Sequence, residues 1–275
     1  MKHFLSLVSD PKIFGRGHLN RQIQIQLELE KQGIHHIICN NNSGLATLEV
    51  HQECVLLLDL SPLDQEPTAD FLDRFSEVIG FDWSGEFVPN RNFVVVSHPG
   101  RKYQGLNLVS IGLHNLIIRS EIAGIALNPN HEDSDYLLIS LGYSSKTNAY
   151  QYAIKIAEKY PGMPKIVACG VGIDISPTDD LSVVIDSSGF VELLAEASAV
   201  ISNGGTTYVE SLLLGKAVLP IPQTKDEQFF VDAMNKLTVS DSALPDFRRL
   251  DSELASQFGV GTQGAFNLCR VMLEK

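Results

Sequence analysis

The sequence predicts an α/β fold made of two domains, each built on a parallel β-sheet flanked by helices. Short apolar runs alternate with longer segments of helical character along most of the chain, which is the pattern of strand–helix–strand units. A polar segment that contains proline, residues 128–135, interrupts this alternation, and the pattern then starts again. Two halves of similar size, each opening on a strand, favour two Rossmann-like domains over a single one.

In the first half, strands are predicted where apolar residues run together between loops. These runs are residues 4–8, 36–39, 54–60, 77–81, 93–96 and 115–119. Helices are predicted over residues 18–32, which Gly33 ends, and over residues 69–76. We assign residues 1–130 to this N-terminal domain.

In the second half, strands are predicted at residues 136–141, 165–169, 183–185, 199–201 and 217–221. Helices are predicted over residues 149–160, 191–197, 206–214, 226–237 and 261–273. The C-terminal domain takes residues 131–258, and residues 259–275 form a final helix. Each predicted strand of this half is followed by a loop and then a helix or strand.

Composition and charge exclude several classes of function. The chain has 275 residues and a formal net charge of -12, so it lacks the broad basic patch that nucleic acid requires, and a bound phosphate would be held by backbone amides and a few side chains. The four cysteines (Cys39, Cys54, Cys169 and Cys269) are far apart, which indicates reduced thiols and a cytoplasmic location, not disulfides or a zinc site. The N-terminal apolar stretch is too short for a signal peptide, and no run reaches membrane-spanning length.

The most informative stretch is a glycine turn between a strand and a helix, within residues 202–222. Gly204 and Gly205 allow close approach of a ligand to the backbone, and Thr206 or Thr207 is predicted to cap the helix. The free N–H groups and the dipole at this helix end favour an anion such as a diphosphate. Glu210, one turn further, could accept hydrogen bonds from ribose hydroxyls. The alternative interpretation is an ordinary strand–helix turn whose glycines serve packing only.

A second glycine-rich segment follows the first strand and opens a helix. It contains Gly15, Gly17, His18 and Arg21, and its glycines leave room for a substrate against the backbone. The helix dipole disfavours an imidazolium cation, so a neutral His18 is available as a base or proton shuttle. The alternative is that His18 only caps the helix or packs. Asn20 stands where a dinucleotide-binding motif has its third glycine, which argues against NAD.

These motifs, taken in order, resemble a known family. They are Gly15-x-Gly17-His18-x-x-Arg21, Asp59 at a strand end, Gly112 before a strand ending in Arg119, residues 138–142, and residues 202–228. Together they resemble the UDP-sugar hydrolases of pseudaminic acid biosynthesis, which are relatives of spore-coat polysaccharide biosynthesis proteins. The second half is more remotely similar to the UDP-GlcNAc transferase of peptidoglycan synthesis. The resemblance implies the GT-B fold, in which two Rossmann-like domains face each other across a cleft and the C-terminal helix crosses back to the first.

The resemblance also implies roles for single residues. His18 would be the catalytic residue, acting on water at the anomeric carbon or assisting departure of the phosphate. The second domain would bind UDP, with the diphosphate at the glycine turn, Glu210 on the ribose, Gln228 on a sugar or diphosphate oxygen and Gly142 beneath the diphosphate. The substrate-binding residues would be Gly15, Gly17, Arg21, Asp59, Gly142, Asn203, Gly204, Gly205, Thr206, Thr207, Glu210 and Gln228. The implied ligand is a UDP-sugar, with no metal and no cofactor, because the helix dipole and amides stabilise the leaving UDP.

The chain departs from the family pattern mainly in the sugar-binding half. Ser61 stands where the family has an active-site tyrosine, Trp83 replaces one of two paired acids, and Asn115 replaces another tyrosine. The loop that reads Gly-Gly-x-Asp in the family reads Gly142-Tyr143-Ser144-Ser145 here, so Tyr143 replaces its second glycine. Trp83 could stack on a sugar or belong to the core. Three hypotheses follow: a UDP-sugar hydrolase, a GT-B glycosyltransferase that uses a UDP-sugar donor, and a non-catalytic UDP-sugar-binding relative.

Overall fold

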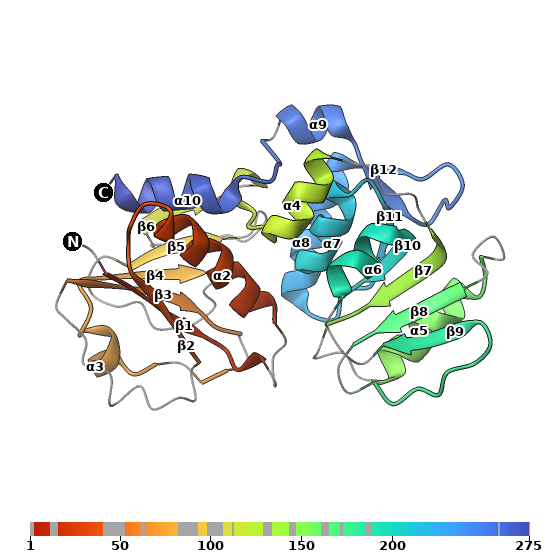
Figure 1. The fold of residues 1–275 in the computed structure, drawn as a ribbon, viewed down its shortest axis with the longest axis horizontal. Helices are drawn as coiled ribbons and strands as arrows, with labels where there is room; N and C mark the ends of the chain where they lie inside the picture. Colours follow the sequence, from red (N-terminus) through yellow and green to blue (C-terminus); the bar gives the residue numbers. More distant parts are fainter. Residues whose placement is uncertain are drawn as a thin grey trace. The chain divides into compact units, whose positions relative to one another are not determined.

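The computed structural model describes residues 3–11, 16–40, 53–61, 64–65, 67–81, 93–97, 107–111, 113–128, 134–142, 147–160, 165–170, 173–184, 189–257 and 259–274. It divides into two compact units, Met1–Ile118 with Val260–Lys275, and Arg119–Gly259. Each unit has its own β-sheet, and parallel strands dominate both, so the predicted α/β class is confirmed (Figure 1). Helix α4 (Ser120–Leu127) precedes the boundary predicted at residue 130 and groups with the second unit.

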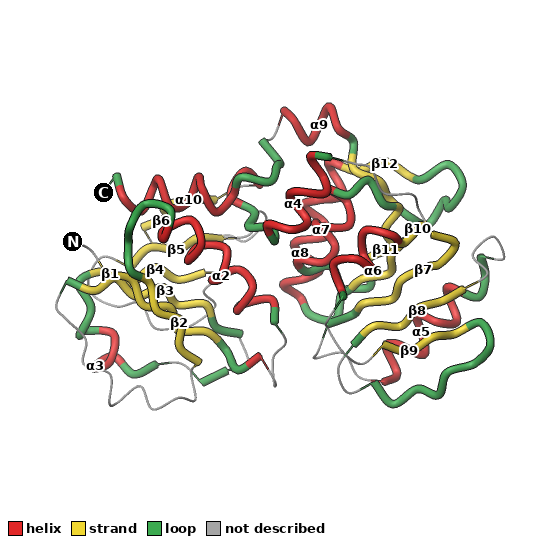
Figure 2. Tube along the Cα trace, in the orientation of Figure 1, coloured by secondary structure: helices red, strands yellow, loops and turns green. Residues whose placement is uncertain are grey.

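The sheet of the first unit has six parallel strands in the order β2-β1-β3-β4-β5-β6. Their bounds are β1 His3–Val8, β2 His36–Asn40, β3 Cys54–Asp59, β4 Glu77–Phe81, β5 Phe93–Ser97 and β6 Asn107–Ile111. The helices of this unit are α2 Gly17–Glu30, α3 Ala69–Leu72 and α10 Gly264–Leu273, with a short 3-10 helix at Leu113–Asn115. Along the chain, helix α2 separates β1 from β2, and α3 separates β3 from β4 (Figure 2).

Helices cover both faces of this sheet, which explains the uninterrupted apolar sequence of β3. Val55 and Leu57 point to the face covered by α2 and α10, where Leu29 and Leu268 meet them. The alternate residues Leu56 and Leu58 point to the other face, against Leu72 and Phe75 in and after α3. Because side chains alternate along a strand, a strand buried on both sides reads as a continuous apolar run. Helix α10 lies beside α2 in the first unit (Figure 1).

We expect Gly264→Ala to destabilise the first unit, because α10 begins in close contact with a neighbouring segment. A Cβ atom at Gly264 would lie 1.9 Å from the carbonyl oxygen of Leu116, so either the helix or that segment must shift. The free energy of unfolding should fall by about 2 kcal/mol, as for other overpacked sites. Urea denaturation followed by circular dichroism measures it. The control is Gly124→Ala in α4, where a Cβ meets nothing within 4 Å; an equal loss in both variants would contradict the prediction.

The second unit contains a seven-stranded sheet in the order β12-β13-β11-β10-β7-β8-β9. Strands β11, β10, β7, β8 and β9 are parallel, and β13 and β12 add an antiparallel edge. The bounds are β7 Ser134–Ser140, β8 Lys165–Cys169, β9 Leu181–Val184, β10 Ala197–Ser202, β11 Ala217–Pro220, β12 Thr238–Ser240 and β13 Arg248–Leu250. The helices are α4, α5 Thr147–Ala157, α6 Phe190–Glu196, α7 Thr206–Leu213, α8 Lys225–Met234 and α9 Ser252–Gln257, with a 3-10 turn at Asn235–Leu237.

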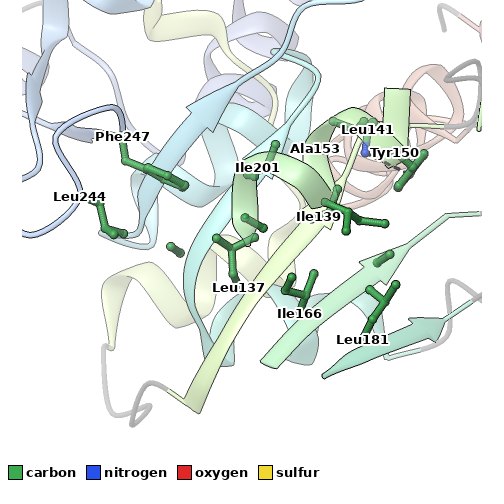
Figure 3. Packing of buried hydrophobic residues seen from close by; sticks show 14 of the residues in the cluster. Leu137, Ile139, Leu141, Tyr150, Ala153, Ile166, Leu181, Ile201, Leu244 and Phe247 are labelled. Carbon is green, nitrogen blue, oxygen red and sulfur yellow. Dashed lines mark hydrogen bonds between the residues drawn. The ribbon is translucent and has the colours of Figure 1, made fainter. Parts of the chain in front are cut away.

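One face of this sheet packs against α5 to form the core seen in Figure 3. Ile139 of β7, Ile166 of β8 and Ile201 of β10 contribute to it, together with Ala153 of α5. Tyr150 of α5 is buried there as well, and its hydroxyl accepts the N–H of Leu141 at 3.0 Å and donates to the carbonyl of Cys169 at 2.9 Å. This hydroxyl therefore fixes the carboxyl ends of β7 and β8, where the loops of the sheet begin.

The structure corrects the sequence-based elements at several places. Residues 115–119 are not a strand; a 3-10 helix ends at Asn115, and the buried segment after it leads into α4. Strands β6, β12 and β13 and helices α4 and α9 were not predicted. No helix within the described ranges combines the length and the apolar character that a membrane span needs.

Candidate functional site

In the first unit, a polar cluster forms where β1 and β3 end and α2 begins. Val8 and Asp59 are register partners at the carboxyl ends of these parallel strands, so the helix that follows β1 starts beside Asp59. His18 Nδ1 lies 2.7 Å from Asp59 Oδ1, and Arg21 donates from Nε to Oδ2 at 2.8 Å and from a terminal nitrogen to Oδ1 at 2.6 Å. Gln22 Nε2 donates to Oδ2 at 2.8 Å. Both Asp59 oxygens are thus engaged by three residues of α2.

Asp59 is ionised despite complete burial. Burial raises the pKa of its carboxyl, but the charge of Arg21 and the hydrogen bonds from His18 and Arg21 outweigh it and hold that pKa at about 2. The Arg21 guanidinium is itself placed over the ring of Phe81, 5.3 Å from its centroid. Asp59 is one of the predicted substrate-binding residues; in the structure its fully buried side chain contacts His18.

The ionised carboxylate fixes which nitrogen of His18 carries the proton. A carboxylate can only accept, so Nδ1 donates to Asp59 and Nε2 carries the lone pair. The His18 side chain is 22% exposed while that of Asp59 is fully buried. His18 can therefore take a proton at Nε2 while Asp59 stabilises the resulting cation, which is the chemistry of a general base oriented by a carboxylate.

A chain of buried hydrogen bonds continues from Asp59 into the unit. Ser6 donates its hydroxyl proton to Gln22 Oε1 at 2.7 Å, and His36 Nε2 lies 2.6 Å from the same Ser6 oxygen. All three side chains are buried. Because the Ser6 proton is used toward Gln22, His36 must donate from Nε2. Its other nitrogen, Nδ1, is buried and has no hydrogen-bond partner among the described residues.

His36 should make the protein less stable in weak acid. Burial, with a smaller contribution from His35, lowers the pKa of its imidazole from 6.5 to about 4. The folded state then binds fewer protons than the unfolded state between these values, so the stabilising effect is complete above pH 6.5 and is lost as the pH falls to 4. The loss should reach about 3 kcal/mol at pH 4, since each pKa unit is worth about 1.4 kcal/mol. His36→Gln, which cannot titrate, should remove this step from urea unfolding curves measured across the range; an unchanged step would assign it to another group.

In the second unit, the predicted glycine turn lies between β10 and α7. Gly204 has a φ of +90°, and a Cβ atom there would meet Val231 of α8 at 2.6 Å, so glycine is required for both conformation and space. Asn203 donates to the carboxylate of Glu227, and its Oδ1 accepts the N–H of Gly205 at 3.3 Å. A Cβ on Gly142, at the end of β7, would lie 3.1 Å from Asn203 Nδ2. Asn203 thus joins the turn to α8 and lies near the end of β7.

The N-terminus of α7 is open to an anion. Its N-cap is Gly205 and no side chain caps it, which corrects the prediction that Thr206 or Thr207 is the cap. Among the described residues, the backbone N–H groups of Thr206 and Thr207 have no hydrogen-bond partner. A helix end with free amides and a positive dipole is suited to a phosphate group.

Glu210 lies one turn into α7, as predicted, but its carboxylate is already engaged. Arg119 donates its backbone N–H to Oε1 at 3.2 Å, its Nε to Oε1 at 2.9 Å and a terminal nitrogen to Oε2. Glu210 is fully buried, and the Arg119 guanidinium also lies 4.8 Å from the centroid of the Phe190 ring. A ribose could reach this carboxylate only if Arg119 moved.

Some of the other residues singled out from the sequence are described in the structure, and some lie outside the described residues. Gln228 is exposed on α8 and donates to Asp232 of the same helix at 2.8 Å. Gly17 is the first residue of α2. Gly15, Trp83 and Tyr143 lie outside the described residues. Of the two departures that are described, Ser61 donates its N–H to Ser9 Oγ at 2.7 Å, and Asn115 is buried.

Sequence reasoning missed Gln22, Tyr150 and Glu227. The Thr224-x-x-Glu227 spacing is that of a capping box, which the structure contains at the start of α8, so this signal could have found Glu227. Burial raises the pKa of Glu227, although the N–H groups of Gln223 and Thr224 and the side chain of Asn203 oppose this shift. Within the part of the chain that the structure describes, no three or more His, Cys, Asp or Glu side chains are grouped as a metal site.

No model of a protein family and no curated protein matches this sequence. Solved structures do match in fold. UDP-GlcNAc 2-epimerase of Methanocaldococcus jannaschii, in complex with UDP-GlcNAc and UDP, is 11% identical with a TM-score of 0.51 over 100% of both chains. An alpha-glucosyltransferase in complex with UDP is 11% identical with a TM-score of 0.55 over 99% of this chain and 100% of its own. Anabaena HepE, in complex with UDP and glucose, is 12% identical with a TM-score of 0.50 over 100% of both chains.

The identities of 11–12% are too low to assign a family or an activity, but each similarity extends over 99–100% of this chain. It therefore includes both α/β units and the connection between them. The chain accordingly has a fold of the GT-B type, the fold of these UDP-sugar enzymes.

Proposed function

We propose that the protein is a cytoplasmic UDP-sugar hydrolase, which releases UDP and a free deoxy- or acetamido-sugar in surface polysaccharide or nonulosonic acid biosynthesis. The observation that carries the proposal is the His18–Asp59 pair, in which an ionised and buried carboxylate leaves the Nε2 lone pair of His18 available. A base held in this way suits the activation of water. The ordered motifs shared with the hydrolase family support the same conclusion.

The proposal assigns nucleotide binding to the second unit. The uncapped start of α7, with the free amides of Thr206 and Thr207, supports a diphosphate there. The part-buried hydrogen bond between Asn203 and Glu227 keeps the glycine turn in place against α8. The structural similarity to proteins solved with UDP supports a uridine nucleotide over other phosphates.

The reaction would proceed by attack of water on the anomeric carbon. His18 Nε2 takes a proton from the water as its oxygen bonds to that carbon. The bond between the anomeric carbon and the phosphate oxygen breaks, and UDP leaves with the electron pair. Amides at a helix N-terminus stabilise the negative charge that develops on the diphosphate. Asp59 stays ionised and stabilises the imidazolium formed on His18.

The second candidate is a GT-B glycosyltransferase, in which a hydroxyl of a sugar or lipid replaces water. The similarity to an alpha-glucosyltransferase, with a TM-score of 0.55, favours it. The same base and the same diphosphate site would serve both reactions, because only the acceptor differs.

Calorimetric titration with UDP, followed by product analysis over a panel of UDP-sugars without any acceptor, tests the proposal. We expect heat on UDP binding and release of equal amounts of free sugar and UDP. Release of UDP only when an acceptor is supplied would establish the transferase instead. Conversion to a 2-epimer would overturn both candidates. Binding without turnover, unaffected by His18→Gln, would identify a non-catalytic UDP-sugar-binding protein, and no heat with UDP would refute nucleotide binding.

A further inference from the structure

Behind the His18–Asp59 pair, four buried side chains are joined in one row of hydrogen bonds. The row runs from His36 on β2 through Ser6 on β1 to Gln22 on α2 and ends on Asp59 of β3. It therefore crosses three adjacent strands and the helix that carries His18. His36, Ser6 and Gln22 are polar, and each is nevertheless at least nine-tenths buried.

Every donor in this row points the same way. Gln22 must direct its NH2 group to Asp59, because an ionised carboxylate only accepts. Its carbonyl oxygen then faces Ser6, which must donate, and Ser6 can only accept from His36. The proton positions of the whole row follow from the charge of Asp59. Hydrogen bonds aligned in this manner polarise one another, and burial strengthens them.

We propose that His36, Ser6 and Gln22 are positioning residues, which hold the Asp59 carboxylate in the one orientation that keeps His18 protonated on Nδ1. This inference rests on the proposed role of His18 as a base. Arg21 neutralises Asp59 and contacts both carboxylate oxygens, and Gln22 is the donor that joins the carboxylate to the buried row. Gln22 occupies Oδ2 from the buried side and leaves Oδ1 to His18 and Arg21. The row ends at His36, whose Nδ1 has no hydrogen-bond partner among the residues that the structure describes.

The directions of these hydrogen bonds predict the tautomers of two histidines. His18 should carry its proton on Nδ1, and His36 should carry it on Nε2. Nitrogen-15 NMR of histidine side chains distinguishes the two tautomers without reference to any reaction. The His18 signals can be identified from a His18→Gln spectrum and those of His36 from a His36→Gln spectrum.

The test compares Gln22→Leu and Ser6→Ala with a matched control in the full-length protein. Gln22→Leu removes a donor that holds the Asp59 carboxylate in place, so the carboxylate can turn away from His18. We expect His18 to become a mixture of tautomers and kcat to fall about 100-fold with KM nearly unchanged, since small errors in catalytic geometry have effects of this size. Ser6→Ala breaks the row one step further away and should lower kcat about tenfold. The control is Ser9→Ala, since Ser9 is equally buried and, within the described part of the chain, its hydroxyl accepts the N–H of Ser61 and contacts no member of the row.

The readouts separate the two proposals. If His18 is an Nδ1–H tautomer in the wild-type protein and loses this preference in Gln22→Leu but not in Ser9→Ala, the positioning role holds, even if no UDP-sugar is hydrolysed. If the His18 signals and kcat are the same in Gln22→Leu as in the wild-type protein, the row serves packing alone and the inference is wrong. Loss of both in Ser9→Ala to the same degree would likewise reduce the effect to general destabilisation.

Discussion

Asp59→Asn should lower kcat for UDP-sugar hydrolysis by about 10²–10⁴-fold, the range seen when a catalytic histidine loses its carboxylate or its correct tautomer. The asparagine side chain has nearly the same shape, so the packing around it changes little. Its amide can donate a hydrogen to Nδ1 of His18, which places the histidine proton on Nε2 and removes the lone pair that accepts a proton from water. The cation formed on His18 would also lose its counter-charge.

The measurement is steady-state kinetics of sugar release, with UDP affinity measured separately by calorimetry. UDP affinity should change less than about threefold, because the proposed diphosphate site lies in the second unit and a change in Kd of that size is under 1 kcal/mol. The matched control is Asp241→Asn, a second buried aspartate paired with an arginine, Arg249. Equal effects of both substitutions on kcat would show that loss of stability, and not loss of the base, is responsible.

The sequence was sufficient for the strands whose burial is continuous. Residues 54–58 are apolar on both faces because helices cover both sides of the sheet, and such runs are recognisable without any structure. The same reasoning failed for the apolar run after Asn115. Ile117 is buried because α10 packs against this segment, where Leu268 belongs to the same core cluster. Leu268 is distant along the chain, so the sequence around Ile117 does not reveal this packing.

The candidate site shows the same division. The local sequence was enough to predict the glycine turn and the position of His18 at the start of a helix, because glycine pairs and helix boundaries are features of neighbouring residues. Gln22 was missed because a polar residue on the inner face of α2 contradicts the apolar pattern by which that face is recognised. Its function depends on Ser6 and Asp59, which only the fold brings to it. The threonines at the glycine turn were predicted to cap α7; the structure leaves its amides open instead.

Arg119 provides the clearest case of a partner that no local pattern reveals, since it lies 91 residues from Glu210.

The Arg119–Glu210 ion pair also leads to a prediction about ligand binding. Glu210→Ala should lower UDP affinity by at least about tenfold, the equivalent of 1.4 kcal/mol, because it removes the acceptor proposed for the ribose hydroxyls. It should also lower the free energy of unfolding by about 3 kcal/mol, because Arg119 is then left mostly buried without its counter-charge.

Arg119→Met separates these two effects, because it breaks the same ion pair from the other side. It leaves the Glu210 carboxylate buried without its partner, so the unfolding free energy should fall by a similar amount, about 3 kcal/mol. The carboxylate nevertheless remains available to ribose, and Arg119 no longer competes for it, so UDP affinity should stay the same or increase. Both variants are to be titrated with UDP at a temperature at which circular dichroism shows them folded. Equal losses of affinity in the two would mean that Glu210 acts only through the ion pair that secures Arg119, and the ribose assignment would have to be abandoned.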